Sequence, residues 1–473
     1  MPPASLPACI DDPLGQLRYH SAIATDDHHL TLFMEEPLAT AVPCLTTALT
    51  GPLARLETEL LANQIAIEQW FRSRFREHPA PFYCSVDLRN SGFKLAPVDT
   101  NLFPAGFNNL NPAFNSLSVQ ALQAAVERIC PNARGVVVVP ENHTRNTFYF
   151  ESLAALIELM HMAGLNVRIG SLLPDLHAPR SITLPSGRVL TLEPLTRSGE
   201  RVQVGDFDPC FVLLNNDLSA GRPAILEGLQ QAVVPALDLG WSNRLKSNHF
   251  THYRAVAAEL GRILGLDPWF IDPIFRRCGM INFEKNEGKE CLEANVEDVL
   301  TRVAAKYREH GIDRAPFAII KADAGTYGMA IMTVKSPADV QNINRKQRTK
   351  MAHTKDGQTV TDVLVQEGVY SFETWDGAVA EPVVYMIDHY VVGGFYRVHK
   401  ERGADENLNS PGMHFEPLAF AEPCICPQRG RPGAGANRFY SYGVIARLAL
   451  LAAAREAEQA AAKPALSLAA HAS

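Results

Sequence analysis

Residues 317–334, FAIIKADAGTYGMAIMTV, decide how the C-terminal half of this chain folds. An apolar strand delivers Lys321, a turn containing two glycines follows, and a second apolar strand begins directly after it. Glycines let backbone N–H groups approach phosphate oxygens closely, and a lysine neutralises their charge. The stretch is not a Walker loop, which reads GxxxxGK[ST] and opens a helix. Taken alone, it is better explained by a hairpin with turn glycines and a solvated lysine.

Three further signals follow it in a fixed order. Residues 363–369 (VLVQEGV) are a short apolar strand with an amide and an acid at its end. Residues 381–397 (EPVVYMIDHYVVGGFYR) read as paired strands that finish in an arginine, and residues 406–412 (ENLNSPG) group an acid with two asparagines. This order resembles the ATP-grasp fold, in which a strand–Gly turn–strand lid covers the phosphates of ATP.

The resemblance implies a role for each part. The lysine and the backbone of the glycine turn would hold the phosphates, the QEG strand would hold adenine and ribose, and the arginine would stabilise the transferred phosphoryl group. A second lysine of the fold usually lies upstream, beside the adenine, and Lys285 and Lys289 are alternatives for it. The catalytic candidates are Lys321 and Arg397, and the ATP-binding candidates are Lys285, Lys321, Gly325, Thr326, Tyr327, Gly328, Gln366 and Glu367.

The same resemblance implies Mg²⁺ held by a Glu-x-Asn element. Mg²⁺ takes oxygen ligands and bridges the phosphates of ATP. The spacing from Glu406 to Asn409 is one residue longer than in the fold family, so Asn407 and Asn409 compete for the ligand role. Further acids that could complete the site are Asp388, Asp405 and Glu416.

Upstream, strands alternate with helices. Residues 135–139 (GVVVV) are typical of a strand covered on both faces. A helix that ends at Gly164 follows, and residues 165–172 and 210–217 are two further strands. The stretch ILEGLQQAV reads as the next helix. The alternation predicts a parallel α/β sheet, in which ligands collect at the carboxyl ends of the strands. The polar loops there supply the candidates Asn142, Arg145 and Asn215. Helix capping explains each of these residues equally well.

Polar segments among aromatic residues are the candidates for binding a second substrate. Residues 87–94 (DLRNSGFK) and 99–109 (DTNLFPAGFNN) combine acids, amides and cations, as does GWSNRLKSNHF at 240–250. An arginine or lysine could clamp a carboxylate, and an acid or amide could take an ammonium group. A solvated surface or an exposed ion pair is the alternative. The substrate candidates in these segments are Asp87, Arg89, Lys94, Asp99, Asn101, Arg244 and Lys246.

Longer stretches, such as VDLRNSGFKLAPVDTNLFPAGFNNL and INFEKNEGKECLEANVEDVL, resemble a bacterial glutamate–cysteine ligase family. The resemblance covers the chain from about residue 25 to about residue 440. It implies the substrates glutamate and cysteine, the cofactors ATP and Mg²⁺, and the first step of glutathione biosynthesis. The alternatives are another ATP-grasp carboxylate–amine ligase and a non-catalytic amino-acid-binding protein on the same scaffold.

The composition is that of an ordinary soluble globular protein. The net charge is −7, which gives no electrostatic reason to bind nucleic acid or an anionic membrane. Nine scattered cysteines without a CxxC pair favour free thiols over a disulfide framework or a zinc ribbon. The N-terminus lacks the pattern of a signal peptide, and no apolar run reaches the ~20 residues of a membrane span. We therefore expect a cytoplasmic location, and the sequence leaves a homo-oligomer open.

Together these patterns predict an α/β protein: an N-terminal parallel α/β substrate domain followed by an ATP-grasp-like α+β domain. The first domain, residues 1–265, begins with helices over about 27–80 and contains an inserted hairpin at 179–195. The second, residues 266–440, binds the nucleotide. Residues 441–473 form a C-terminal helix and a tail that is disordered from Lys463.

Overall fold

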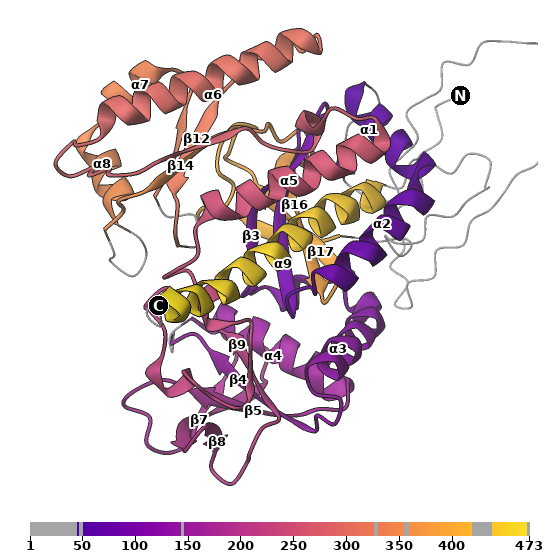
Figure 1. Ribbon diagram of the computed structural model, residues 1–473, viewed down its shortest axis with the longest axis vertical. Coiled ribbons are helices and arrows are strands. Elements are labelled where there is room, and N and C mark those ends of the chain that lie inside the picture. The colour runs from indigo at the N-terminus through magenta and orange to yellow at the C-terminus, as the bar shows by residue number, and fades with distance from the viewer. Residues whose placement is uncertain are drawn as a thin grey trace, which may run out of the picture. The chain divides into compact units, whose positions relative to one another are not determined.

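Three β-sheets organise the part of the chain that the structure describes (Figure 1). The computed structural model describes residues 45–46, 51–142, 146–325, 330–353, 359–418 and 438–470, all of which belong to one compact unit. None of the helices in these residues is long and apolar enough to cross a membrane.

The smallest sheet is antiparallel, in the order β11-β14-β12-β13. Its strands are β11 (Phe275–Cys278), β12 (Ala318–Ala322), β13 (Ile331–Val334) and β14 (Val363–Glu367). Helix α6 (Lys289–Glu309) covers one face, because its apolar residues recur every three or four positions and pack on Ile320 and Val365. Two short helices, α7 (Pro337–Gln341) and α8 (Arg345–Ala352), follow β13. The two strands predicted on either side of the glycine turn are thus confirmed as β12 and β13, which pair antiparallel.

The second sheet has the order β10-β9-β4-β5-β7-β6, with β8 paired to β7. The strands are β4 (Gly135–Pro140), β5 (Asn166–Ser171), β6 (Arg180–Thr183), β7 (Val189–Ser198), β8 (Arg201–Val204), β9 (Phe211–Asn215) and β10 (Ala232–Val234). The neighbours from β10 to β7 run parallel, and β6 and β7 form the predicted hairpin. Every residue of β4 is buried, with Val136 packed on the side of α4 (Thr147–Met162). Helix α3 (Asn115–Ile129) packs beside α4.

The third sheet is large, antiparallel and assembled from distant parts of the chain. Its strands are β1 (Leu45–Thr46), β2 (Tyr83–Asn90), β3 (Leu95–Asn101), β15 (Thr374–Trp375), β16 (Ala378–Ile387), β17 (Tyr390–His399) and β18 (His414–Pro417). β16 pairs with β17 and also with β2, which in turn pairs with β3. The predicted paired strands at 381–397 are therefore the centre of a wider sheet.

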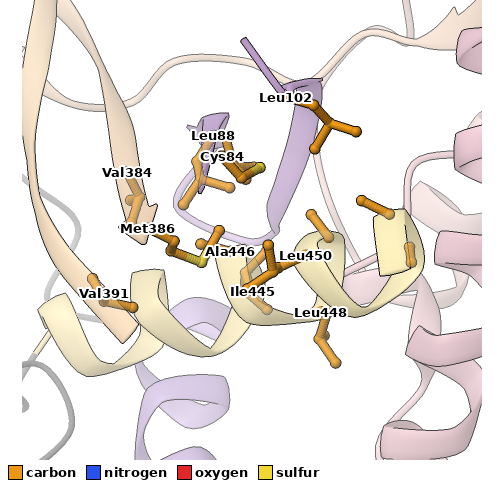
Figure 2. Close-up of a cluster of buried hydrophobic side chains, with 14 of the residues drawn as sticks. Cys84, Leu88, Leu102, Val384, Met386, Val391, Ile445, Ala446, Leu448 and Leu450 are labelled. Atoms are coloured by element: carbon orange, nitrogen blue, oxygen red, sulfur yellow. The ribbon is translucent and has the colours of Figure 1, made fainter. Parts of the chain in front are cut away.

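The C-terminal helix α9 (Arg438–Ala470) packs on this large sheet. Ile445, Ala446 and Leu450 lie in one buried cluster with Cys84 of β2 and Val384 of β16 (Figure 2). Helix α5 (Lys246–Leu264) lies alongside α9 (Figure 1), and α1 (Pro52–Ala62) and α2 (Gln64–Glu77) complete the helical layer. The apolar, Ala-rich character of α9 reflects this burial.

Some expectations from the sequence differ from the structure. The boundary expected at residue 265 does not separate two sheets, because β2 pairs with β16 across it. The helix expected over ILEGLQQAV is wrong: a single 3₁₀ turn at Ala224–Leu226 is followed by strand β10. Gly228 has a φ of 63° there, which interrupts a helix. Helix α9 continues past Lys463, where the tail was expected to begin.

Candidate active site

Lys321 lies near the end of β12, where the small sheet meets β3 of the large sheet. Its Nζ donates to the carbonyl of Val98 at 2.6 Å and lies 5.2 Å from the ring centre of Phe250. Burial lowers the pKa of Lys321 to about 8; Asp99 opposes this shift and Lys246 reinforces it. The junction therefore holds a buried lysine that is still mostly charged at neutral pH.

A second cation and two acids lie next to Lys321. Lys246 Nζ, at the start of α5, contacts both carboxylate oxygens of Asp99 at 2.9 Å. Asp99 and Asp87 are register partners on β3 and β2. Burial alone would raise the pKa of Asp99, but Lys246 and Lys321 outweigh it and hold that pKa well below its ordinary value. Asp99 is thus a carboxylate that is charged at neutral pH, and its side chain is 39% exposed.

Arg397 on β17 completes a charged cluster that also contains Lys321, Lys246, Asp99 and Asp87. It donates to Asp87 at 3.0 Å and to Glu381 at 2.5 Å. Burial alone would lower the pKa of Arg397. Asp87 and Glu381 outweigh burial, so the pKa is raised above its ordinary value. Burial raises the pKa of Asp87, with Arg397 opposing and Glu381 reinforcing the shift. The strand register explains these contacts. Arg397 is the register partner of Glu381, and Asp87 is the partner of Val383, two residues further along β16. The side chains of Arg397, Glu381 and Asp87 therefore lie on one face of the sheet.

Arg89 reaches this cluster through Glu381. Its Nε donates to Glu381 at 2.9 Å, and its other nitrogens donate to the carbonyls of Val369 and Glu406. All three partners are protein groups, and the guanidinium is buried. Arg89 therefore ties β2 to the segment after β14 and to the loop before β18.

Lys94 and Glu367 form a buried ion pair at 2.8 Å, each with a side chain only 1% exposed. Glu367 also accepts from the Trp269 indole and from the backbone of Ile274, and Lys94 also donates to the carbonyl of Asp272. A substrate carboxylate at Lys94, or a ribose hydroxyl at Glu367, would have to open these bonds. The pair joins the β2–β3 hairpin to β14.

Arg244 is likewise held by a protein carboxylate. It forms a bidentate ion pair with Glu456 of α9, at 3.0 and 3.1 Å, and donates to the carbonyl of Thr100.

Arg244 and Glu456 line a cavity of about 530 Å³ between the start of α5 and the C-terminal half of α9. Lys321 and Arg397 do not line this cavity, so it adjoins the charged cluster without containing it.

Asp323 fastens the end of β12 to helix α5. This fully buried acid accepts from the backbone N–H and the hydroxyl of Ser247, both at 2.7 Å, and its carbonyl accepts from the N–H of Lys246. Arg277 of β11 lies 3.2 Å from its carboxylate. The relative position of Lys321 and Lys246 is therefore fixed by Asp323.

The small sheet presents a second group beside Lys321. Side chains alternate along a strand, and Ile320 and Val365 pack toward α6, so Lys321 and Gln366 lie on the opposite face. Gln366 is buried, and its Nε2 has no hydrogen-bond partner among the described residues. Gly325 follows β12 in the chain and has a φ of 90°. Thr326, Tyr327 and Gly328 lie outside the described residues.

The candidates in the polar loops serve the parallel sheet itself. Asn215 is buried, donates to the Tyr83 hydroxyl and to the Pro104 carbonyl, and accepts from Tyr149. Asn101 closes a turn onto the N–H of Phe103. Asn142 is exposed, and Arg145 lies outside the described residues.

The candidate metal ligands form a local turn before β18. The Glu406 carboxylate accepts from the N–H of Gly403 and from Arg402, and the Asn407 side chain bonds the backbone of Asn409 in both directions. The turn joins the charged cluster through the Glu406 carbonyl, which Arg89 binds. Its oxygen donors, and the carboxylate of Asp87, are of the kind that Mg²⁺ prefers. Lys285 lies in the turn between β11 and α6, where its backbone N–H donates to the Asn282 side chain.

Sequence reasoning missed three acids that organise the site: Glu381, Asp323 and Glu456. Glu381 stands at the start of an apolar strand, and Glu456 stands on a face of α9 that is otherwise apolar and Ala-rich. A charged residue inside an apolar segment signals a buried partner. The sequence could have given this signal, although not the identity of the partner.

The chain was compared with known families, curated proteins and solved structures. Residues 57–457 match a family model described as glutamate-cysteine ligase, GshA. The crystal structure of a candidate γ-glutamylcysteine synthetase from Methylobacillus flagellatus KT is 57% identical, with a TM-score of 0.82, covering 88% of this chain and 99% of that one. No match was found among curated proteins.

Two further structures match only weakly. A glutathione synthetase-like effector from Globodera pallida is 9% identical, with a TM-score of 0.32, covering 73% of this chain and 76% of that one. D-alanyl-alanine synthetase A from Vibrio cholerae is also 9% identical, with a TM-score of 0.26, covering 54% of this chain and 68% of that one. Likeness at this level carries no argument. The family model and the 57% identical structure, in contrast, span most of the chain. The chain therefore belongs to the glutamate–cysteine ligase family, a family of ATP-dependent ligases.

Proposed function

We propose that the protein joins the γ-carboxylate of glutamate to the amine of cysteine where Lys321 of β12 contacts β3. The observation that carries this proposal is the convergence of Lys321, Lys246 and Arg397 on Asp87 and Asp99. Three cations around two partly exposed acids suit a reaction whose participants are phosphates, carboxylates and ammonium groups.

The reaction takes two steps and needs no protein nucleophile. A γ-carboxylate oxygen of glutamate attacks the γ-phosphorus of ATP, the bond to the leaving ADP breaks, and γ-glutamyl phosphate forms. The cysteine amine then attacks the acyl carbon, phosphate leaves, and the nitrogen loses a proton. Lys321 and Arg397 stabilise the negative charge on the transferred phosphoryl group, so that catalysis is positioning plus charge neutralisation.

We place ATP on the face of the small sheet that carries Lys321 and Gln366, in an ATP-grasp-like arrangement. Two buried donors without a partner among the described residues support this placement: Nε2 of Gln366 and Nε of Arg397. Buried donors are normally satisfied, so these two are candidate contacts for ligand atoms. Gly325 lets the backbone approach the phosphates.

Mg²⁺ would be held by Asp87, the Glu406 carboxylate and one asparagine. We favour Asn409, because the Asn407 side chain is used in the turn onto Asn409. The ion would neutralise phosphate charge when bound.

The amino-acid substrates would meet Lys246 and Asp99. Arg89, Lys94 and Arg244, the other cations considered for a carboxylate, are held in buried ion pairs with Glu381, Glu367 and Glu456. Lys246 pairs with a partly exposed acid instead, so it is the cation most readily shared with a substrate carboxylate. Asp99 stays charged and would take an α-ammonium group.

The test is ADP release from ATP and Mg²⁺ with glutamate, with and without cysteine, and a mass measurement of the product. Release that depends on cysteine, with γ-glutamylcysteine as the product, is the expected result. Release with a different amine would keep the ligase mechanism and reject the substrate pair. If none of a broad panel of amines supports ADP release, the proposal is overturned.

A further inference from the structure

Two free cysteines lie in contact beside the nucleotide-binding sheet. Cys278 ends β11, Cys291 lies in the first turn of α6, and their sulfur atoms are 2.9 Å apart. A disulfide bond measures 2.03–2.05 Å, so the sulfurs need to approach by only roughly 0.9 Å to form one. Neither residue has a role in the ligase reaction proposed above.

The two thiols differ in access. Cys278 is 1% exposed, whereas Cys291 is exposed on the surface of α6. Burial, with Cys291 next to it, raises the pKa of Cys278 to about 12. Asn295, one turn further along α6, donates to the Cys291 sulfur at 3.4 Å. Cys291 is therefore the thiol that a reagent in solution meets first, and Cys278 is the thiol that resolves the product.

We propose that Cys278 and Cys291 are a reversible disulfide site, oxidised by a low-molecular-weight disulfide. The Cys291 thiolate attacks the reagent RSSR, giving a Cys291–S–SR mixed disulfide and one RS⁻. The Cys278 thiolate then attacks the Cys291 sulfur, the Cys278–Cys291 bond forms, and a second RS⁻ leaves. The two thiol protons end on two RSH molecules, so RSSR is reduced as the pair is oxidised.

The bond would act on the site through Arg277, the neighbour of Cys278. Arg277 lies 3.2 Å from the carboxylate of Asp323 and 2.7 Å from that of Asp362. Asp323 stands two residues after Lys321 and fixes it against α5. Drawing Cys278 toward α6 disturbs this ion pair, so oxidation should lower turnover. This consequence rests on the proposed function, whereas formation of the disulfide does not.

The substrate and the product of the proposed reaction can supply the disulfide reagent RSSR. Cysteine and γ-glutamylcysteine are thiols, and their oxidised forms are disulfides of the required class. The site would thus couple the rate of thiol synthesis to the oxidation state of the thiols themselves.

The experiment treats the full-length protein with cystine, blocks remaining thiols, and maps its tryptic peptides by mass. Peptides 278–285 and 290–302 should be recovered as one linked species, which dithiothreitol separates and which Cys291→Ser abolishes. Cys130→Ser, at a half-buried thiol elsewhere, should leave the linked species in place. A stable cystine adduct on Cys291 without the linked species, or no reaction there, would overturn the site.

Turnover is measured on the same samples. Oxidised wild type should lose roughly 2- to 10-fold in ATP turnover and regain it with dithiothreitol, whereas Cys291→Ser should not respond. A linked species with unchanged turnover would overturn the coupling through Arg277. If the ligase reaction itself is wrong, no ADP is released before or after oxidation, and the peptide map still decides the disulfide site.

Discussion

Asp87 and Asp99 lie opposite each other in the β2–β3 hairpin, yet their pKa values are displaced in opposite directions. That of Asp87 is raised, chiefly by burial, and that of Asp99 is lowered because two lysines outweigh its burial. Two neighbouring acids of one sheet therefore differ in character: two lysines favour the charged form of Asp99, whereas only Arg397 favours that of Asp87 against its burial. Under the proposed function, Asp99 would take the ammonium group and Asp87 would face the metal ion.

Lys321→Met should abolish most of the activity while stabilising the fold. We expect kcat to fall by about 10²–10³, the cost of removing one donor to a charged transition state. The free energy of unfolding at pH 7 should rise by about 1–2 kcal/mol, because a buried charge is removed and only a hydrogen bond to Val98 is lost. Steady-state kinetics and urea unfolding measure both. Lys346→Ala, on the exposed face of α8, is the matched control; equal activity in the two variants would contradict the role of Lys321.

The pH dependence of the free enzyme should report Lys321. Its pKa in the folded state is about 8, below the ordinary 10.5, so the phosphate-binding charge is lost above about pH 8. We expect kcat/KM for ATP to decline through that value. Between pH 8 and 10.5 the folded state binds fewer protons than the unfolded state at this residue, so this residue's contribution to stability becomes more favourable as pH rises. A profile flat to pH 9.5 would show that Lys321 does not govern ATP binding.

Lys94→Met should unfold the protein more readily without a specific loss of glutamate affinity. The substitution leaves Glu367 buried with its Trp269 and Ile274 bonds but no cation, which costs about 3–5 kcal/mol. Lys94→Met/Glu367→Leu should recover most of this loss, since the uncompensated charge is gone. Chemical unfolding of the single and double variants tests the pair. A stable Lys94→Met with a large rise in KM for glutamate would instead restore the substrate-clamp interpretation.

Glu456→Gln should destabilise the protein by about 3 kcal/mol, because it breaks the buried pair with Arg244. Asp298→Asn, at the exposed Arg276 ion pair, should change stability by less than about 1 kcal/mol. The pKa of Glu456 is lowered from 4.5 to about 2, because Arg244 and His249 outweigh its burial. Its contribution is therefore complete above pH 4.5 and is lost as the pH falls toward 2.

Urea unfolding from pH 7 to pH 3 measures this dependence. The difference between wild type and Glu456→Gln should be constant down to about pH 4.5 and then shrink. A difference that grows as the pH falls would contradict the assignment.

Local patterns predicted the elements well, and the sheets that they form less well. The buried run GVVVV and the glycine-punctuated stretch around Lys321 specify β4, β12 and β13, because period and turn chemistry act over a few residues. The pairing of β2 with β16 could not be predicted, since nothing local records which strands meet. The buried cations show the same limit. Arg89, Lys94 and Arg244 looked like substrate ligands because their buried partners, Glu381, Glu367 and Glu456, lie far away along the chain.

The pairing of β2 with β16 also constrains how the chain is made. Arg89 and Glu381 are 292 residues apart, so a ribosome adding 5–20 residues per second finishes β2 roughly 15–60 s before its partner emerges. During that interval β2 and β3 present an open edge and the apolar face that α9 later covers. The newborn protein therefore leaves this edge and this face uncovered for tens of seconds, an aggregation hazard that its ordinary composition does not indicate.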